Sequence, residues 1–156
     1  MALGILGGSL TPSSKSSPEI SETEYRVLSE FRYQLSAFLR RRRDAAQAAG
    51  LEPQQYELLL AIKGLAPDKQ PTIKQIAEQL KLQHHSAVEL VNRMAKRGLV
   101  CRNPSSHDRR AVLLSLTRPA EKVLQEIARY SLSQLQLEAP QLLKTLGHLL
   151  KTQAGD

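Results

Sequence analysis

The feature that most constrains the fold of this chain is a pair of short amphipathic segments near its middle, joined by three residues. In the first segment, Ile76, Ala77 and Leu80 share one face of a two-turn helix. The second segment is longer, and four apolar residues fall on one face of it: Ala87, Leu90, Val91 and Met94. Two short helices with only residues 81–83 between them have the spacing of a helix-turn-helix, and the sequence predicts this motif.

A β-hairpin is predicted directly after this motif. Residues 99–103 and 111–117 have strand character, and in the second stretch Val112, Leu114 and Leu116 alternate with Leu113 and Ser115. Between the two strands lies the polar segment PSSHDRR, residues 104–110. We therefore expect a hairpin with a basic tip.

Helices are predicted on both sides of this central part. Ser21 and Glu24 have the spacing of a capping box, which begins a helix that ends at Gly50, and a second short helix begins at Pro53. After the hairpin, Thr117 caps a further helix, Pro140 marks a break, and a last amphipathic helix follows. An extended piece is expected at residues 71–73.

The predicted fold class is mainly α with a small β-hairpin wing, a winged helix-turn-helix flanked by dimerisation helices. The expected organisation is a flexible N-terminal arm at 1–20, an N-terminal dimerisation helix at 21–50, the winged module at 51–117, and C-terminal dimerisation helices at 118–156. The arm is predicted from its glycine, proline and serine content, which gains little from burial.

The flanking helices carry long apolar stripes, which in the first helix comprise Leu28, Phe31, Leu35, Phe38 and Leu39. A central module of about eighty residues is too small to cover the stripes on both sides. Pairing of two copies about a two-fold axis covers them economically, so the sequence predicts a homodimer. The alternative is a monomer whose end helices pack only on their own module.

The positive charge of the chain is concentrated in one segment. The formal net charge is +7, and residues 81–110 contain seven basic and two acidic residues, a surplus of five. Such a local surplus is typical of a surface that lies along nucleic-acid phosphates. On the second helix of the motif, the residues that point outward are His85, Glu89, Asn92, Arg93 and Lys96, flanked by Ser86 and Val88. An ordinary solvated helix face is the alternative, and the basic hairpin beside it favours duplex DNA.

Other classes of protein fit the sequence poorly. The single cysteine, Cys101, cannot form an intrachain disulfide and is expected as a small half-buried residue, which favours a reducing cytoplasmic location over secretion. The histidines at positions 84, 85, 107 and 148 lack partners at the spacing of a metal site or catalytic triad. We therefore expect no enzyme, cofactor or metal site, and no membrane-spanning segment.

The segment IAEQLKLQHHSAVELVNRMAKRGLVCRNPSSHDRRAVLLSLT resembles the MarR family of winged helix-turn-helix transcriptional regulators, and the resemblance extends over residues 22–152. Its strongest part is DRRAVLLSLT, which is similar to the wing signature of that family. The resemblance implies a homodimeric regulator, in many relatives a ligand-responsive repressor, whose first, fifth and sixth helices form the dimer interface and whose modules bind a palindromic operator in double-stranded DNA.

The resemblance also implies the site residues. The recognition helix would contribute Gln83, His84, His85, Ser86, Glu89, Asn92, Arg93 and Lys96, and the wing would contribute His107, Arg109 and Arg110, with Asp108 orienting Arg110. His84, His85, Ser86 and Asn92 are the expected base-reading residues. Val88 and Glu89 stand where many relatives have Ser-Arg, so the operator sequence cannot be transferred.

The family further implies a small phenolic or anionic effector between the dimerisation helices and the winged module. Arg40, Arg43 and Tyr56 are the expected effector-binding residues, because at least one arginine of the run 40–43 should face inward near Tyr56. The competing hypothesis for the whole chain is a winged-helix protein-interaction module that does not read DNA sequence.

Overall fold

The computed structural model describes residues 19–108 and 110–152, and within these ranges the chain is mostly helical. The elements are, in chain order, α1 (Glu22–Ala48), α2 (Pro53–Lys63), α3 (Ile73–Leu80), α4 (His84–Lys96), β1 (Val100–Pro104), β2 (Val112–Leu116) and α5 (Arg118–Thr152). The predicted fold class is confirmed. Residues 1–18, most of the predicted arm, lie outside the described residues, and the predicted division into domains stays a prediction.

The helix ends follow the local signals in the sequence. The Ser21 hydroxyl accepts a hydrogen bond from the Glu24 N–H at 3.2 Å, and the Glu24 carboxylate accepts one from the Ser21 N–H at 2.7 Å. The predicted capping box is therefore formed. Gly50 follows α1 with a φ of 78°, a conformation that favours glycine, and Pro53 is the first residue of α2. Thr117 caps α5 through its hydroxyl, which accepts from the N–H three residues on at 3.4 Å.

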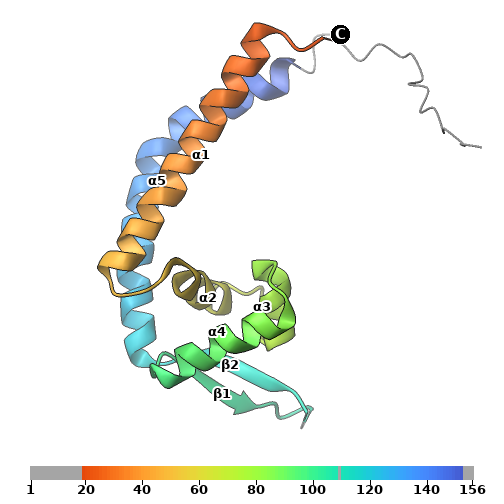
Figure 1. Cartoon of the computed structure of the whole chain (residues 1–156), viewed down its shortest axis with the longest axis vertical. Helices are drawn as coiled ribbons and strands as arrows, with labels where there is room; N and C mark the ends of the chain where they lie inside the picture. Colours follow the sequence, from red (N-terminus) through yellow and green to blue (C-terminus); the bar gives the residue numbers. More distant parts are fainter. Residues whose placement is uncertain (1–18, 109, 153–156) are drawn as a thin grey trace, which may run out of the picture.

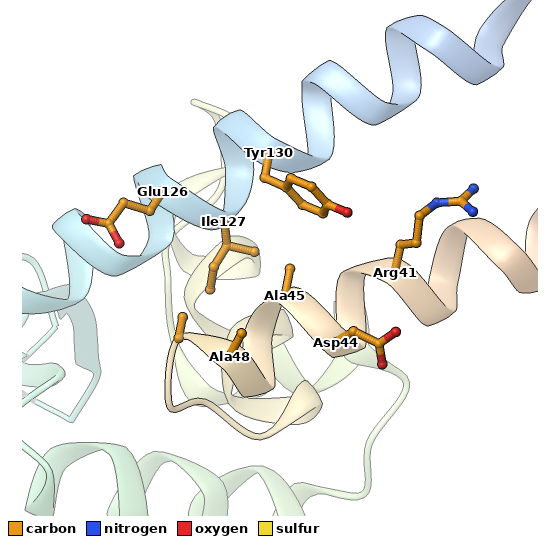
Figure 2. Close-up of a pocket in the computed structure, with 8 residues that line it drawn as sticks. Arg41, Asp44, Ala45, Ala48, Glu126, Ile127 and Tyr130 are labelled. Carbon is orange, nitrogen blue, oxygen red and sulfur yellow. The ribbon is translucent and has the colours of Figure 1, made fainter.

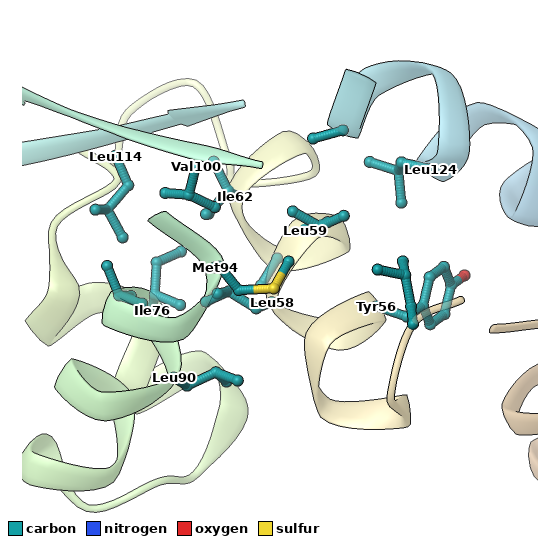
Figure 3. Packing of buried hydrophobic residues seen from close by; sticks show 14 of the residues in the cluster. Tyr56, Leu58, Leu59, Ile62, Ile76, Leu90, Met94, Val100, Leu114 and Leu124 are labelled. Carbon is teal, nitrogen blue, oxygen red and sulfur yellow. The ribbon is translucent and has the colours of Figure 1, made fainter. Parts of the chain in front are cut away.

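The winged module, comprising α2, α3, α4, β1 and β2, closes around one apolar core (Figure 3). Six of its large side chains are less than 2% exposed: Leu58, Leu59, Ile76, Leu90, Val91 and Met94. The whole predicted inward face of α4 is buried. Ala120, Leu124 and Ile127 from the first turns of α5 complete one side. Burying a side chain of leucine size contributes about 1.5–3 kcal/mol, and these residues are buried within a single chain.

The hairpin begins at the core and extends beyond it. Val100 pairs with Leu116, and both Val100 and Leu114 are buried. The predicted extended piece is present at residues 71–72, where the Pro71 carbonyl accepts from the Leu114 N–H at 2.8 Å, whereas residue 73 already belongs to α3. Of the alternating residues of β2, Leu114 is buried, whereas Val112 lies at the outer end of the strand and is 41% exposed.

The C-terminal part corrects the prediction of two helices separated at Pro140, because α5 is one continuous helix with Pro140 inside it. A proline in a helix interior removes one backbone hydrogen bond and costs about 3 kcal/mol. Contacts with α1 hold the helix on both sides of the proline. Arg41 forms an ion pair with Glu138 before it, and the Gln34 amide donates to the Thr145 hydroxyl at 3.1 Å after it.

The helices α1 and α5 lie side by side in antiparallel orientation and form an elongated helix pair next to the winged module (Figure 1). This pair has little interior, since Ala46 is the only buried residue of α1. Phe31 and Phe38 of the predicted stripe are partly covered by the chain. The large apolar residues that stay exposed are Tyr25, Leu28, Tyr33, Leu35 and Leu39 on α1, and Tyr130, Leu132, Leu137, Leu143 and Leu150 on α5. One copy of the chain therefore leaves an apolar face uncovered.

Candidate nucleic-acid interface

The exposed face of α4 carries the residues that the sequence assigned to a recognition helix. Seven of them are exposed: Gln83, His84, His85, Glu89, Asn92, Arg93 and Lys96. Ser86 and Val88 are half-buried at the edges of this face, as predicted. The Gln83 side chain makes no capping hydrogen bond to α4. The first-turn N–H groups can therefore donate to an outside acceptor such as a phosphate oxygen.

The tip of the hairpin is held by short-range hydrogen bonds. Ser105 is buried, and its hydroxyl accepts from the N–H groups of His107 at 3.2 Å and Asp108 at 3.4 Å. The Asp108 carboxylate accepts from the backbone N–H of Arg110 at 2.9 Å. Asp108 thus fixes the backbone that carries Arg110, while Arg110 and His107 are exposed. Arg109, the remaining predicted wing residue, is outside the described residues.

A contact that the sequence did not indicate connects the hairpin to α4. Arg102, near the middle of β1, donates from Nη2 to the side-chain oxygen of Asn92. Arg102 lies on the same side of the strand as Val100, which is buried in the core, and this parity directs its side chain toward α4. The parity of Arg102 with Val100 was visible in the sequence and is the signal that could have found this contact.

A second basic residue of the segment 81–110 is also engaged within the chain. Arg97 donates to the Gln55 side-chain oxygen at 2.5 Å and to the Gly50 carbonyl at 2.9 Å, so it ties the end of α4 to the connection between α1 and α2. The other described basic residues of the segment are all exposed, and we call them the basic surface: Lys81, Arg93, Lys96, Arg102 and Arg110. Glu89 and Asp108 are the exposed acids of the segment, so these five basic residues leave a surplus of three positive charges.

Two clefts adjoin α1 near the winged module. The larger, about 530 Å³, lies between α1 and α5 and is lined by Arg41, Asp44, Glu126 and Tyr130 together with small apolar residues (Figure 2). Figure 2 shows Ala45 and Ile127 between these polar groups. Two carboxylates against one guanidinium make this cleft unfavourable for an anion.

The smaller cleft, about 290 Å³, lies between α1 and α2 and contains the predicted residues Arg43 and Tyr56. It also contains Arg42, which the sequence analysis did not single out. The Arg42 guanidinium lies 3.6 Å from the centre of the Phe38 ring, and its buried Nε has no hydrogen-bond partner among the described residues. Burial lowers the pKa of Arg42, because desolvation disfavours the charged form. The third predicted residue, Arg40, is exposed and does not line this cleft.

Three further observations concern other kinds of site. Cys101 is exposed, which corrects the expectation of a half-buried residue, because its side of β1 faces away from the core that contains Val100. In residues 19–108 and 110–152, no three His, Cys, Asp or Glu side chains are arranged to hold a metal ion. No helix in the same ranges is long and apolar enough to cross a bilayer.

The helix-turn-helix of α3 and α4, followed directly by the β1–β2 wing, defines the class of the chain as a winged helix-turn-helix protein. Residues 49–111 match the family model described as the MarR family. The predicted resemblance to that family is confirmed, and the matched residues comprise most of the winged module. No functionally curated protein matches the chain significantly.

Solved structures extend the likeness beyond the module. AbsC, a MarR family transcriptional regulator from Streptomyces coelicolor, is similar with a TM-score of 0.66 and 20% identity, over 88% of this chain and 96% of that one. Wild-type MarR from E. coli in its apo form has a TM-score of 0.59 and 18% identity, over 86% and 98% of the two chains. A mutant of S. aureus MepR bound to an oligodeoxyribonucleotide has a TM-score of 0.62 and 18% identity, over 86% and 99%. At these identities the likeness establishes the fold alone.

Proposed function

We propose that this chain is a DNA-binding transcriptional regulator that acts as a homodimer on a palindromic operator. The observation that carries the proposal is the continuous exposed surface formed by α4 and the wing, with its surplus of basic residues. An α-helix fits the major groove of duplex DNA, and a basic hairpin tip suits the adjacent narrow minor groove. The MepR mutant, which has the same fold, is bound to an oligodeoxyribonucleotide.

Roles within this surface follow from position. His84, His85 and Ser86 in the first turn of α4, and Asn92 further along the helix, are proposed to contact bases. We propose that phosphates or the minor groove are contacted by Arg93 and Lys96 in the last turn of α4 and by the predicted wing residues His107, Arg109 and Arg110. Gln83 precedes α4 and Glu89 lies on its exposed face, and both are proposed to face the DNA, while Asp108 positions Arg110 through the backbone hydrogen bond.

The dimer is proposed from the apolar face of the helix pair. Exposed side chains such as Leu137 at 75% and Leu143 at 68% are costly to leave in water and fit a self-complementary interface. A two-fold dimer places two recognition helices on one face of the duplex, so the operator is expected to have half-sites about ten base pairs apart. The cytoplasmic location expected from the single cysteine is part of this proposal.

Response to a small molecule is proposed for the cleft between α1 and α2. Arg42 and Arg43 against the single carboxylate of Glu57 give it a positive balance, and the unpaired Nε of Arg42 can donate to an anion beside the Tyr56 hydroxyl. A small aromatic carboxylate or phenol is the effector class that fits, and its binding would release DNA from a repressor. Benzoate should raise the melting temperature of the wild type, whereas Arg42→Gln should abolish that shift.

The decisive experiment is selection of bound duplexes from a random oligonucleotide pool, followed by binding titrations at several salt concentrations. We expect a palindromic consensus, and we expect Arg110→Ala to weaken binding to all sequences and to reduce the salt slope by about one. A protein-interaction module would instead give no preferred sequence at any salt concentration. An unchanged affinity of Arg110→Ala would count against the assigned role of the wing.

A further inference from the structure

We infer that Arg102 is a specificity-determining residue, because it holds the side-chain amide of Asn92 in one orientation and thereby sets which base edge Asn92 can contact. The inference rests on the proposed DNA-binding function and deepens it. Arg102 lies on β1 and Asn92 on α4, and the hydrogen bond between Nη2 and Oδ1 joins the two elements. The sequence assigned base reading to α4 alone and no role to a strand residue.

Both partners of this contact stand on a fixed backbone. Arg102 pairs in the hairpin with Leu114, which is 2% exposed. Asn92 follows Val91 and precedes Met94 by two positions, and both of these side chains are completely buried. The α-carbons of Arg102 and Asn92 are therefore held in place by core packing. A contact between side chains on rigid elements loses less rotamer freedom on binding DNA than one between free side chains.

The chemistry of the two groups sets the orientation of the amide. A guanidinium has five N–H donors and no acceptor, so the Asn92 atom that meets Arg102 must be the carbonyl oxygen. The Asn92 NH₂ group then points away from Arg102 and is the part of the amide that is left for DNA. A full pairing of asparagine with adenine needs both atoms, the oxygen for the adenine N6 amino group and the nitrogen for N7.

The consequence is a changed base preference. Because Arg102 occupies one lone pair of the oxygen and fixes the plane of the amide, Asn92 presents its N–H donors to the groove. These donors suit the acceptors of guanine (N7 and O6) or thymine (O4). Without Arg102 the amide is free to turn and to pair with adenine through both atoms. Arg102 would thus select against adenine at the position that faces Asn92, in addition to any attraction of its charge to phosphates.

The test compares Arg102→Ala with Lys96→Ala, which removes the same charge from the last turn of α4 and leaves the hydrogen bond to Asn92 in place. Duplexes that differ only at the base pair facing Asn92 are titrated with each variant. We expect Arg102→Ala to raise the affinity for the duplex with adenine at that position, relative to the duplex with guanine, by about fivefold. This factor corresponds to one hydrogen bond. Lys96→Ala should weaken binding to all duplexes by the same factor. Equal weakening of all duplexes by Arg102→Ala would overturn the inference and leave Arg102 as a phosphate contact.

A second variant tests the outward donor itself. Asn92→Asp keeps an oxygen for Arg102 and replaces the outward NH₂ by another oxygen. We expect this variant to lose the preference for guanine or thymine at that position, whereas a retained preference would show that the Asn92 donor is not used.

A measurement without DNA separates this inference from the proposed function. In the free full-length protein, the ¹⁵N–¹H side-chain resonances of Asn92 should shift in Arg102→Ala and stay in place in Arg110→Ala, which removes an equal charge from the exposed wing tip. Absence of that shift refutes the contact whether or not the protein binds DNA. A shifted Asn92 resonance in Arg102→Ala, together with no preferred DNA sequence for the wild type, would refute the proposed function and with it the consequence for bases, while the contact itself would stand.

Discussion

The winged module and the helix pair use their apolar residues in opposite ways. The module encloses six large side chains at less than 2% exposure, and its outer surface carries the basic residues. The helix pair has leucines up to 75% exposed and only Ala46 buried within α1. The comparison teaches that the module buries its apolar residues, with the help of α5, and exposes charge, whereas the helix pair exposes apolar area. The first surface suits DNA and the second suits another copy of the chain.

The largest expected effect comes from placing a charge on the apolar face of the helix pair. Leu137→Asp should weaken dimerisation by about 3–5 kcal/mol, because an unpaired carboxylate would be buried in the interface. Sedimentation velocity over a range of concentrations measures the change. Gln70→Asp, at an exposed polar position in the connection between α2 and α3, is the control and should leave the dimer intact. If Leu137→Asp remains as dimeric as the wild type, this face is not the interface.

A truncation in the module should act on folding instead of assembly. Leu58 is completely buried, so Leu58→Ala is expected to lower the free energy of unfolding by about 2–5 kcal/mol. Leu60, two residues along the same helix, is 41% exposed, and Leu60→Ala should change stability by less than about 0.5 kcal/mol. Urea unfolding at one fixed protein concentration compares the two. Similar losses in both variants would contradict the distinction between core and surface in α2.

The proline in α5 tests how far the helix pair is optimised for its own stability. Pro140→Ala restores a backbone hydrogen bond and removes the clash of the ring, so we expect unfolding to become harder by about 1–3 kcal/mol. Thermal unfolding followed by circular dichroism measures this. A less stable variant would mean that the proline shapes α5 for a contact. The dimer dissociation constant of Pro140→Ala would then show whether that contact lies in the dimer interface.

The smallest effect is expected where the two regions are joined by charge. Lys63 of α2 donates to the Glu121 carboxylate of α5 at 2.7 Å, and this hydrogen bond, followed by the charge of Lys63, lowers the pKa of Glu121. A depressed carboxyl pKa contributes stability above the unfolded-state value, and this is lost as the pH falls through the folded-state value. Glu121→Gln should therefore be slightly less stable than the wild type at pH 7 and equal to it in acid. Melting temperatures from pH 7 to pH 3 measure the difference, and a gap that widens in acid would contradict the assignment.

The fold of the winged module could be predicted closely because its signals are local. The apolar spacing of α3 and α4, the capping box at Ser21 and the strand character of the hairpin depend on residues a few positions apart. The break at Pro140 was predicted wrongly for the same reason. The local penalty of proline is real, but contacts of α5 with α1, about one hundred residues earlier in the chain, outweigh it.

The candidate site was predicted in part. The exposure of His85, Asn92 and Arg110 follows from periodicity and hairpin position, whereas the contacts of Arg97 and Arg102 depend on how separate elements meet. Composition treats all arginines of the segment 81–110 alike. In the structure Arg97 donates to the connection between α1 and α2, whereas Arg102 donates to Asn92. Only tertiary packing distinguishes these roles.

Because α5 is one continuous helix, a small rotation at one of its ends produces a large displacement at the other. At 1.5 Å per residue its 35 residues span about 50 Å, and its first turns are fixed in the core of the winged module while its later turns lie along α1. A tilt of only about 4° at one end displaces the other by about 3.5 Å at this length. Roughly that displacement separates neighbouring base pairs along DNA. A small change in how two helix pairs meet would thus move each module by a full step along the groove.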